Sequence, residues 1–123
     1  MSGELHLLCA ARWILSRGPR LVVIKKGEHG VLCFSKESVF SVPAFLLENI
    51  FDPTGAGDSF AGGFIGYLTR SPRLAAAVVR RAVIYGSVLA SYNVESFSLR
   101  RLVKLKKSDI ETRVRHFREL TRF

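Results

Sequence analysis

The chain has 123 residues, of which 48% are hydrophobic, so it is long enough for one domain with a modest core and too apolar for a disordered chain. Its formal net charge is +9. No apolar run reaches transmembrane length and no signal-peptide pattern is visible, so we expect a cytoplasmic protein without a membrane partner. The three histidines are isolated and show no metal-ligand spacing: His6, His29 and His116.

The first third of the chain predicts a helix followed by short strands. The helix spans residues 5–16, with Leu5, Leu8, Cys9, Arg12 and Trp13 at helical spacing, and Gly18-Pro19 ends it. We expect Trp13 to be a core or interface anchor. The two cysteines, Cys9 and Cys33, lie in apolar patterns without a C-x-x-C, which favours buried free thiols.

A continuous apolar run at residues 21–24 predicts a strand buried on both faces, as in a parallel sheet. Residues 26–30 form a turn, and strands are expected at Val31–Phe34 and Val39–Val42. Residues 43–51 connect the last strand to a glycine-rich loop.

This loop, Asp52-Pro53-Thr54-Gly55-Ala56-Gly57-Asp58-Ser59-Phe60-Ala61-Gly62-Gly63, has four glycines and two acids in twelve residues. A glycine turn that opens a helix presents N–H groups and partial positive charge to an anion, usually phosphate. An acid there is repulsive unless it has a task, such as accepting a proton from an attacking hydroxyl. The alternative is that Asp58 is an ordinary helix N-cap and the glycines only make a turn.

Two common phosphate-binding motifs do not fit the loop. No Gly-Lys-Ser/Thr follows at the spacing of a Walker A loop. A dinucleotide fingerprint would need a third glycine at position 60, which is Phe60.

Two helices are expected after the loop. The first spans residues 59–69, with one small-residue face and one apolar stripe. The face needs close packing to offset the low helix propensity of glycine. The second is opened by Ser71 as N-cap and Pro72 as N1, runs to about Tyr92, and could end at Asn93. The small face is Ser59, Gly62, Gly63 and Gly66, and the stripe is Phe60, Phe64 and Leu68.

The last 24 residues hold nine Lys/Arg and three Asp/Glu. Residues 108–111 fit a capping box at a helix start. The predicted apolar face is Ile110, Val114, Phe117 and Leu120 or Thr121, and the predicted surface arginines are Arg113, Arg115, Arg118 and Arg122. The basic face is either simply solvated or a polyanion-binding surface. No helix-turn-helix, zinc-finger or RNP pattern supports the second interpretation.

The glycine–aspartate loop, continued by Gly62-Gly63-Phe64, resembles the C-terminal signature of the PfkB (ribokinase-like) carbohydrate kinases. Residues 21–31 resemble the strand–turn–strand before that signature, and residues 82–93 resemble the nucleotide-bordering helix after it. The resemblance implies an α/β fold: the C-terminal part of a ribokinase-like three-layer α/β/α architecture, lacking the N-terminal half and the lid. Residues 1–123 would be a single partial domain, the nucleotide- and phosphate-binding part.

The same resemblance implies an ATP-dependent phosphotransferase that moves the γ-phosphate to a hydroxyl of a sugar or nucleoside, with Mg²⁺ and K⁺ as cofactors. Gly55, Ala56 and Gly57 would form the anion hole and Asp58 would be the catalytic base. Asp52 and Thr54 match positions that bind a monovalent cation. Pro53 and Val83 depart from the family pattern, where Thr and Asn are common. The residues implied along the nucleotide are Lys25, Lys26, Gly27, Glu28 and Gly30, together with Gly57 and Asp58.

The family's sugar-binding residues, Gly-Gly hinge and Asn-x-x-Glu motif have no counterpart in the chain. We therefore expect the isolated chain to be catalytically poor. One alternative is a non-catalytic nucleotide-binding fragment that associates with a partner, as a homo-oligomer or with a missing N-terminal half. The other is a basic nucleic-acid-binding module, which the sequence supports less.

Overall fold

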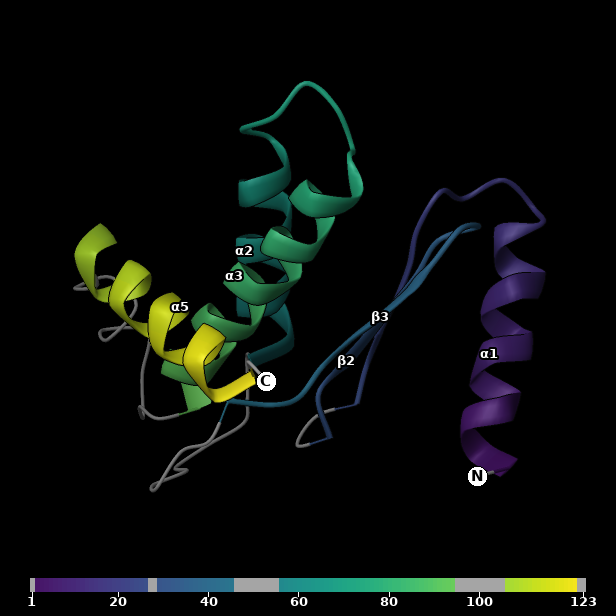
Figure 1. The fold of residues 1–123 in the computed structure, drawn as a ribbon, viewed down its shortest axis with the longest axis horizontal. Helices are drawn as coiled ribbons and strands as arrows, with labels where there is room; N and C mark the ends of the chain where they lie inside the picture. The colour runs from purple at the N-terminus through teal and green to yellow at the C-terminus, as the bar shows by residue number, and fades with distance from the viewer. Residues whose placement is uncertain (1, 27–28, 46–55, 95–105, 122–123) are drawn as a thin grey trace. The chain divides into compact units, whose positions relative to one another are not determined.

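The computed structural model describes residues 2–26, 29–45, 56–94 and 106–121. The chain forms two compact units, Met1–Val42 and Pro43–Phe123. The first unit contains a helix and a three-stranded sheet, and the second contains helices (Figure 1). The elements are α1 (Ser2–Leu15), β1 (Val22–Lys25), β2 (Val31–Phe34), β3 (Val39–Val42), α2 (Ala56–Leu68), α3 (Ala76–Val94) and α5 (Lys107–Thr121).

Helix α1 packs on the sheet through a face that shares Leu8 with the predicted residues but excludes Cys9 and Trp13. Ala11 and Leu15 are buried together with Phe34 of β2, and Leu8 packs against them. Trp13 is 61% exposed, with the Arg17 guanidinium 4.6 Å from its ring centroid. Trp13 is therefore not a core residue, and the alternative of an interface anchor stays a prediction. The helix ends before Gly18, whose φ of +125° favours glycine.

The sheet is antiparallel, in the order β1-β2-β3. The predicted ranges of β2 and β3 are confirmed, whereas the parallel, doubly buried strand expected at residues 21–24 was wrong. In β1, the residues Val22 to Ile24 are only partly buried. The physical reason is the short connections, because a few residues can close a hairpin but cannot make the crossover that parallel neighbours need.

The two thiols differ in environment. Cys33 in β2 is 4% exposed, as predicted, whereas Cys9 on α1 is exposed and its predicted burial was wrong. Both are free. Burial raises the pKa of the Cys33 thiol, and the raised pKa keeps it in its unreactive protonated form.

We therefore expect Cys9 to react with Ellman's reagent at pH 8 about tenfold or more faster than Cys33, because Cys9 is accessible and Cys33 is buried with a raised pKa. The measurement is the time course of thionitrobenzoate release. Cys9→Ser should remove the fast phase and Cys33→Ser the slow one. A single fast phase of two thiols would contradict the burial of β2.

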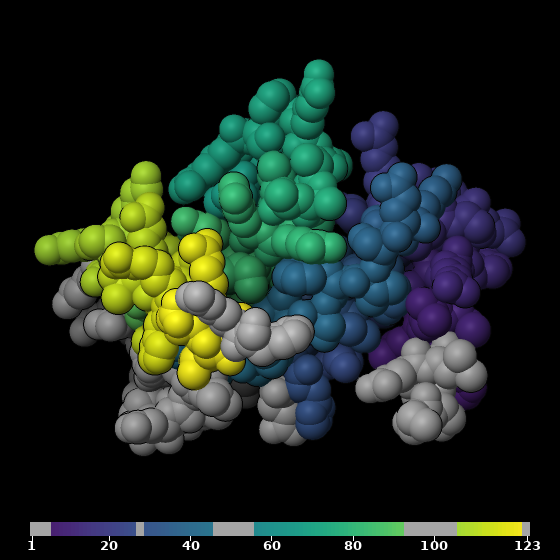
Figure 2. Space-filling view, viewed as in Figure 1, coloured from purple at the N-terminus to yellow at the C-terminus, as the bar shows by residue number. Residues whose placement is uncertain are grey.

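Helices α2 and α3 lie side by side as a helical hairpin (Figure 1) and pack without a visible gap in the space-filling view (Figure 2). The contact centres on two glycines. A Cβ on Gly63 would lie 3.0 Å from the Gly86 Cα, and a Cβ on Gly86 would lie 2.8 Å from the Phe60 carbonyl oxygen. The close packing that was expected to explain the glycines of α2 is therefore found at Gly63, whereas Gly62 and Gly66 face open space.

The starts of α2 and α3 differ from the predictions. Helix α2 begins at Ala56, three residues before the predicted start. Helix α3 begins at Ala76 and not at Ser71-Pro72. The Ser71 hydroxyl instead donates to the Arg73 carbonyl (3.2 Å), a local turn contact that competes with capping. Helix α3 also continues through Asn93 to Val94.

Helix α5 covers α3 with the predicted apolar face, where Val114 and Phe117 are buried, while Leu120 is 48% exposed. The N-cap of α5 lies two residues before Ser108, the first residue of the predicted capping box. The Lys106 N–H donates to Asp109 Oδ2 (3.0 Å), so the helix begins at Lys107.

Arg113 was predicted on the surface, but it is partly buried in the contact between α5 and α3. Its Nη1 donates to Ser91 Oγ (3.0 Å), and its guanidinium lies 3.6 Å from the Tyr92 ring centroid. The Tyr92 hydroxyl donates to the Asp109 carbonyl (3.1 Å). Arg113 thus joins the two helices rather than contributing to an exposed basic face.

Candidate active site

The predicted catalytic residue lies in the first turn of α2. The helix begins at Ala56, and Gly57 and Asp58 are exposed. Asp58 is the third helical residue, so the interpretation of Asp58 as the N-cap was wrong. The first N–H groups of a helix have no acceptor within the helix, and the dipole adds positive charge, so this end suits an anion. Asp52, Thr54 and Gly55 lie outside the described residues.

The upstream turn belongs to the first unit. Lys25 is the last residue of β1, and the backbone of Lys26 makes two hydrogen bonds across the turn. Its N–H donates to the Gly30 carbonyl (2.7 Å), and its carbonyl accepts from the His29 N–H (3.0 Å). Gly30 has φ +92°, a conformation that side chains rarely adopt. Gly27 and Glu28 lie outside the described residues.

The structure shows these two segments each by itself, because they belong to different units. The single nucleotide site that the resemblance implies therefore stays a prediction. On α3, Val83 is fully buried, at 0% exposure, so its side chain packs inside the unit. The buried hydroxyl of Ser87, one turn further along, has no hydrogen-bond partner among the described residues.

Within the described ranges, no group of three or more His, Cys, Asp or Glu side chains could hold a metal ion. Across the same part of the chain, no helix has the length and apolarity needed to cross a membrane.

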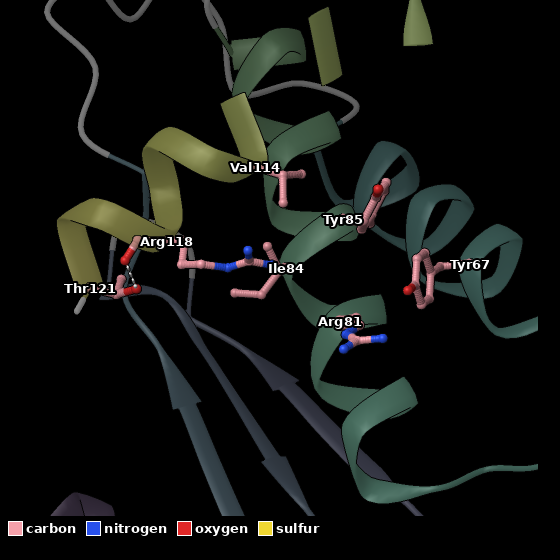
Figure 3. A pocket seen from close by; sticks show the side chains of 7 residues that line it. All are labelled: Tyr67, Arg81, Ile84, Tyr85, Val114, Arg118 and Thr121. Carbon is pink, nitrogen blue, oxygen red and sulfur yellow. Dashed lines mark hydrogen bonds between the residues drawn. The ribbon is translucent and has the colours of Figure 1, made fainter. Parts of the chain in front are cut away.

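Sequence reasoning missed a cavity in the second unit. It measures about 310 Å³ and is lined by side chains of all three helices (Figure 3). No single segment carries a signal for it, since Arg81 and Arg118 are far apart in sequence and only the packing of α5 brings them to one cavity. The lining residues are Tyr67, Arg81, Ile84, Tyr85, Val114, Arg118 and Thr121.

The family profile described as pfkB family carbohydrate kinase matches residues 4–104. The chain belongs to this family. The match includes both segments of the candidate site and helices α1, α2 and α3 almost completely. It confirms the resemblance that the loop around Asp58 carried.

Comparison with a single related protein shows how much of each chain is similar. The deoxyribokinase of Salmonella typhi is 34% identical over 82 residues, which is 67% of this chain and 26% of that protein. This chain therefore spans about a quarter of that relative's length.

Solved structures show the same partial coverage. Aminoimidazole riboside kinase of Salmonella enterica, complexed with aminoimidazole riboside and an ATP analogue, matches 85% of this chain and 35% of its own, with a TM-score of 0.73 at 24% identity. A fructokinase double mutant of Vibrio cholerae, bound to fructose, ADP and potassium, matches 82% and 32%, with a TM-score of 0.72 at 22% identity. The fold of the matched part is ribokinase-like.

Proposed function

We propose that this chain carries the phosphate-transfer end of an ATP-dependent sugar or nucleoside kinase of the PfkB family. The observation that carries the proposal is an exposed carboxylate, Asp58, in the first turn of α2, next to the exposed Gly57. Helix N-termini are general anion-binding positions, so a base and an anion site would share this turn.

Asp58 is the proposed general base. It accepts the proton of the substrate hydroxyl as the oxygen attacks the γ-phosphorus, and the bond from that phosphorus to the β–γ bridging oxygen breaks, which releases ADP. Such transfers depend mostly on positioning and charge stabilisation, so a weak base is sufficient. The exposure of Asp58 leaves it accessible to a hydroxyl.

Gly55, Ala56 and Gly57 are the proposed anion hole. Backbone N–H groups at a helix start are fixed by the helix, so they stabilise developing charge without reorganising. The absence of side chains at positions 55 and 57 would let a phosphoryl group approach the backbone closely.

The proposed nucleotide and cation contacts lie upstream. Lys25, Lys26, Gly27, Glu28 and Gly30 are the proposed contacts along the nucleotide. Asp52 and Thr54 are the proposed ligands of K⁺, as suggested by the potassium ion bound by the Vibrio cholerae fructokinase variant. Mg²⁺ usually keeps several waters and is bound through substrate phosphates and one or two carboxylates. Asp58 is the one acidic residue of α2 and α3, which fits an ion held mainly by the nucleotide.

The acceptor is proposed to be a sugar or nucleoside, as the names of the relatives suggest. About three quarters of the deoxyribokinase has no counterpart in the aligned part of this chain. We therefore propose that the groups that select the acceptor belong to that remainder.

Calorimetric titration of the chain with ATP and Mg²⁺ tests the proposal. We expect saturable binding that weakens by about tenfold or more in Gly57→Leu, because a side chain there blocks the approach of phosphate to the backbone. Gly62→Leu is the matched control, since Gly62 lies on the same helix and faces open space. Absence of ATP binding, or equal weakening by both variants, would contradict the anion hole.

A further inference from the structure

The cavity between α2, α3 and α5 has features of a second anion site (Figure 3). Arg81 comes from α3 and Arg118 from α5, and both are exposed. Neither guanidinium group is paired with another described residue, and none of the seven lining residues is acidic. Among the described residues, these two positive charges at one hollow have no acidic partner, a disposition that favours an anionic ligand.

The positions of these arginines are set by packing. In Figure 3 the Arg118 side chain, which lines the cavity, extends from α5 toward Ile84 on α3. The preceding turns of α5 are fixed by the buried Val114 and Phe117 and by the hydrogen bond from Arg113 to Ser91. The charge that enters the cavity is thus carried by a helix with a defined position on α3.

Two tyrosines line the cavity, one on α2 and one on α3. The rings of Tyr67 and Tyr85 have centroids 4.6 Å apart and meet at 33°. The Arg70 guanidinium covers both, at 5.4 and 5.7 Å from the centroids. Arg70 therefore has aromatic partners, whereas Arg81 and Arg118 keep their donors for a ligand. The volume of about 310 Å³ corresponds to a small molecule rather than a bare ion.

We propose that this cavity binds a small phosphate monoester, with Arg81 and Arg118 on the phosphate and the tyrosine pair beside the organic group. Arginine's planar fork matches phosphate oxygens two at a time, and a phosphate monoester carries close to two negative charges. Both sugar phosphates and aromatic phosphates share this chemistry. The site is separate from the proposed catalytic turn, since Tyr67 lies nine residues after Asp58, about 14 Å along α2.

The test is a residue-specific titration of the 123-residue chain by ¹⁵N NMR, with ribose 5-phosphate and phenyl phosphate as probes and ribose and phenol as their uncharged counterparts. Residue resolution is needed because the catalytic loop is itself a proposed anion site. We expect saturable shifts at Arg81, Tyr85, Arg118 and Thr121 with one or both esters and none with the uncharged compounds. The preferred ester identifies the organic group.

Variants separate a built site from general attraction to a basic protein. Arg118→Gln and Arg81→Gln should each weaken ester binding at least tenfold, and Arg118→Lys should weaken it by less. Arg115→Gln is the matched control, because Arg115 lies on the same helix outside the cavity and loses the same charge; it should change binding less than twofold. The proposal is overturned if neither ester shifts these signals, if ribose or phenol shifts them equally, or if Arg115→Gln weakens binding as much as Arg118→Gln.

Discussion

Replacing Asp58 by Asn is expected to lower phosphoryl transfer by about 10²- to 10⁴-fold, the usual contribution of a positioned general base. Asparagine keeps the size of the side chain and removes its capacity to accept the hydroxyl proton. Asp58 is exposed in the first turn of α2, so the change should leave the fold intact. The measurement is ADP formation with a panel of ribose, deoxyribose, fructose and cytidine, in a catalytically active form of the protein that contains this chain.

Nucleotide affinity separates a catalytic role from a structural one. We expect ATP to bind Asp58→Asn at least as tightly as the unchanged protein, because a negative charge near the phosphates is removed. Glu111→Gln on α5 is the control, since it removes one exposed negative charge of the same unit away from the loop. Retention of full transfer by Asp58→Asn would show that Asp58 is not the base.

Replacing Gly86 by Ala is expected to destabilise the second unit by about 1–3 kcal/mol, the usual cost of overpacking. The added Cβ would lie 2.8 Å from the Phe60 carbonyl oxygen and 2.9 Å from the Phe60 ring. A backbone oxygen cannot turn aside as a side chain can, so α2 and α3 must move apart. The measurement is the free energy of unfolding from denaturant titration.

Gly66→Ala provides a matched change of opposite sign. Gly66 lies in α2, and a Cβ there meets nothing within 4 Å. Alanine has a higher helix propensity than glycine, so this variant should gain up to about 1 kcal/mol of stability. If Gly86→Ala and Gly66→Ala changed the free energy of unfolding equally, the close contact of the two helices would be wrong.

Local patterns in the sequence were sufficient for much of this protein. Strands β2 and β3 and the buried Val114 and Phe117 of α5 were predicted, because each depends on neighbouring residues or on a fixed spacing. Asp58 was predicted to lie in a loop before the helix, but α2 begins at Ala56 and includes it. The loop also identified the family, which the profile match over residues 4–104 confirms. The catalytic roles assigned to that loop remain predictions.

Other features depended on contacts between distant residues. Cys9 and Trp13 lie at helical spacing with apolar neighbours, yet α1 buries Ala11 and Leu15, because the sheet determines which face is covered. Among the glycines predicted on the small face of α2, Gly63 is the one that contacts α3 closely, because Gly86 of α3 lies opposite it.

The sequence by itself determined the family and most of the helices and strands, since these depend on motif spacing and local propensity. Only the tertiary structure decided the antiparallel order of the sheet, the joining role of Arg113 and the cavity with Arg81 and Arg118. These features arise where segments far apart in the chain meet, and the side chains present at such a meeting are set by packing rather than by periodicity.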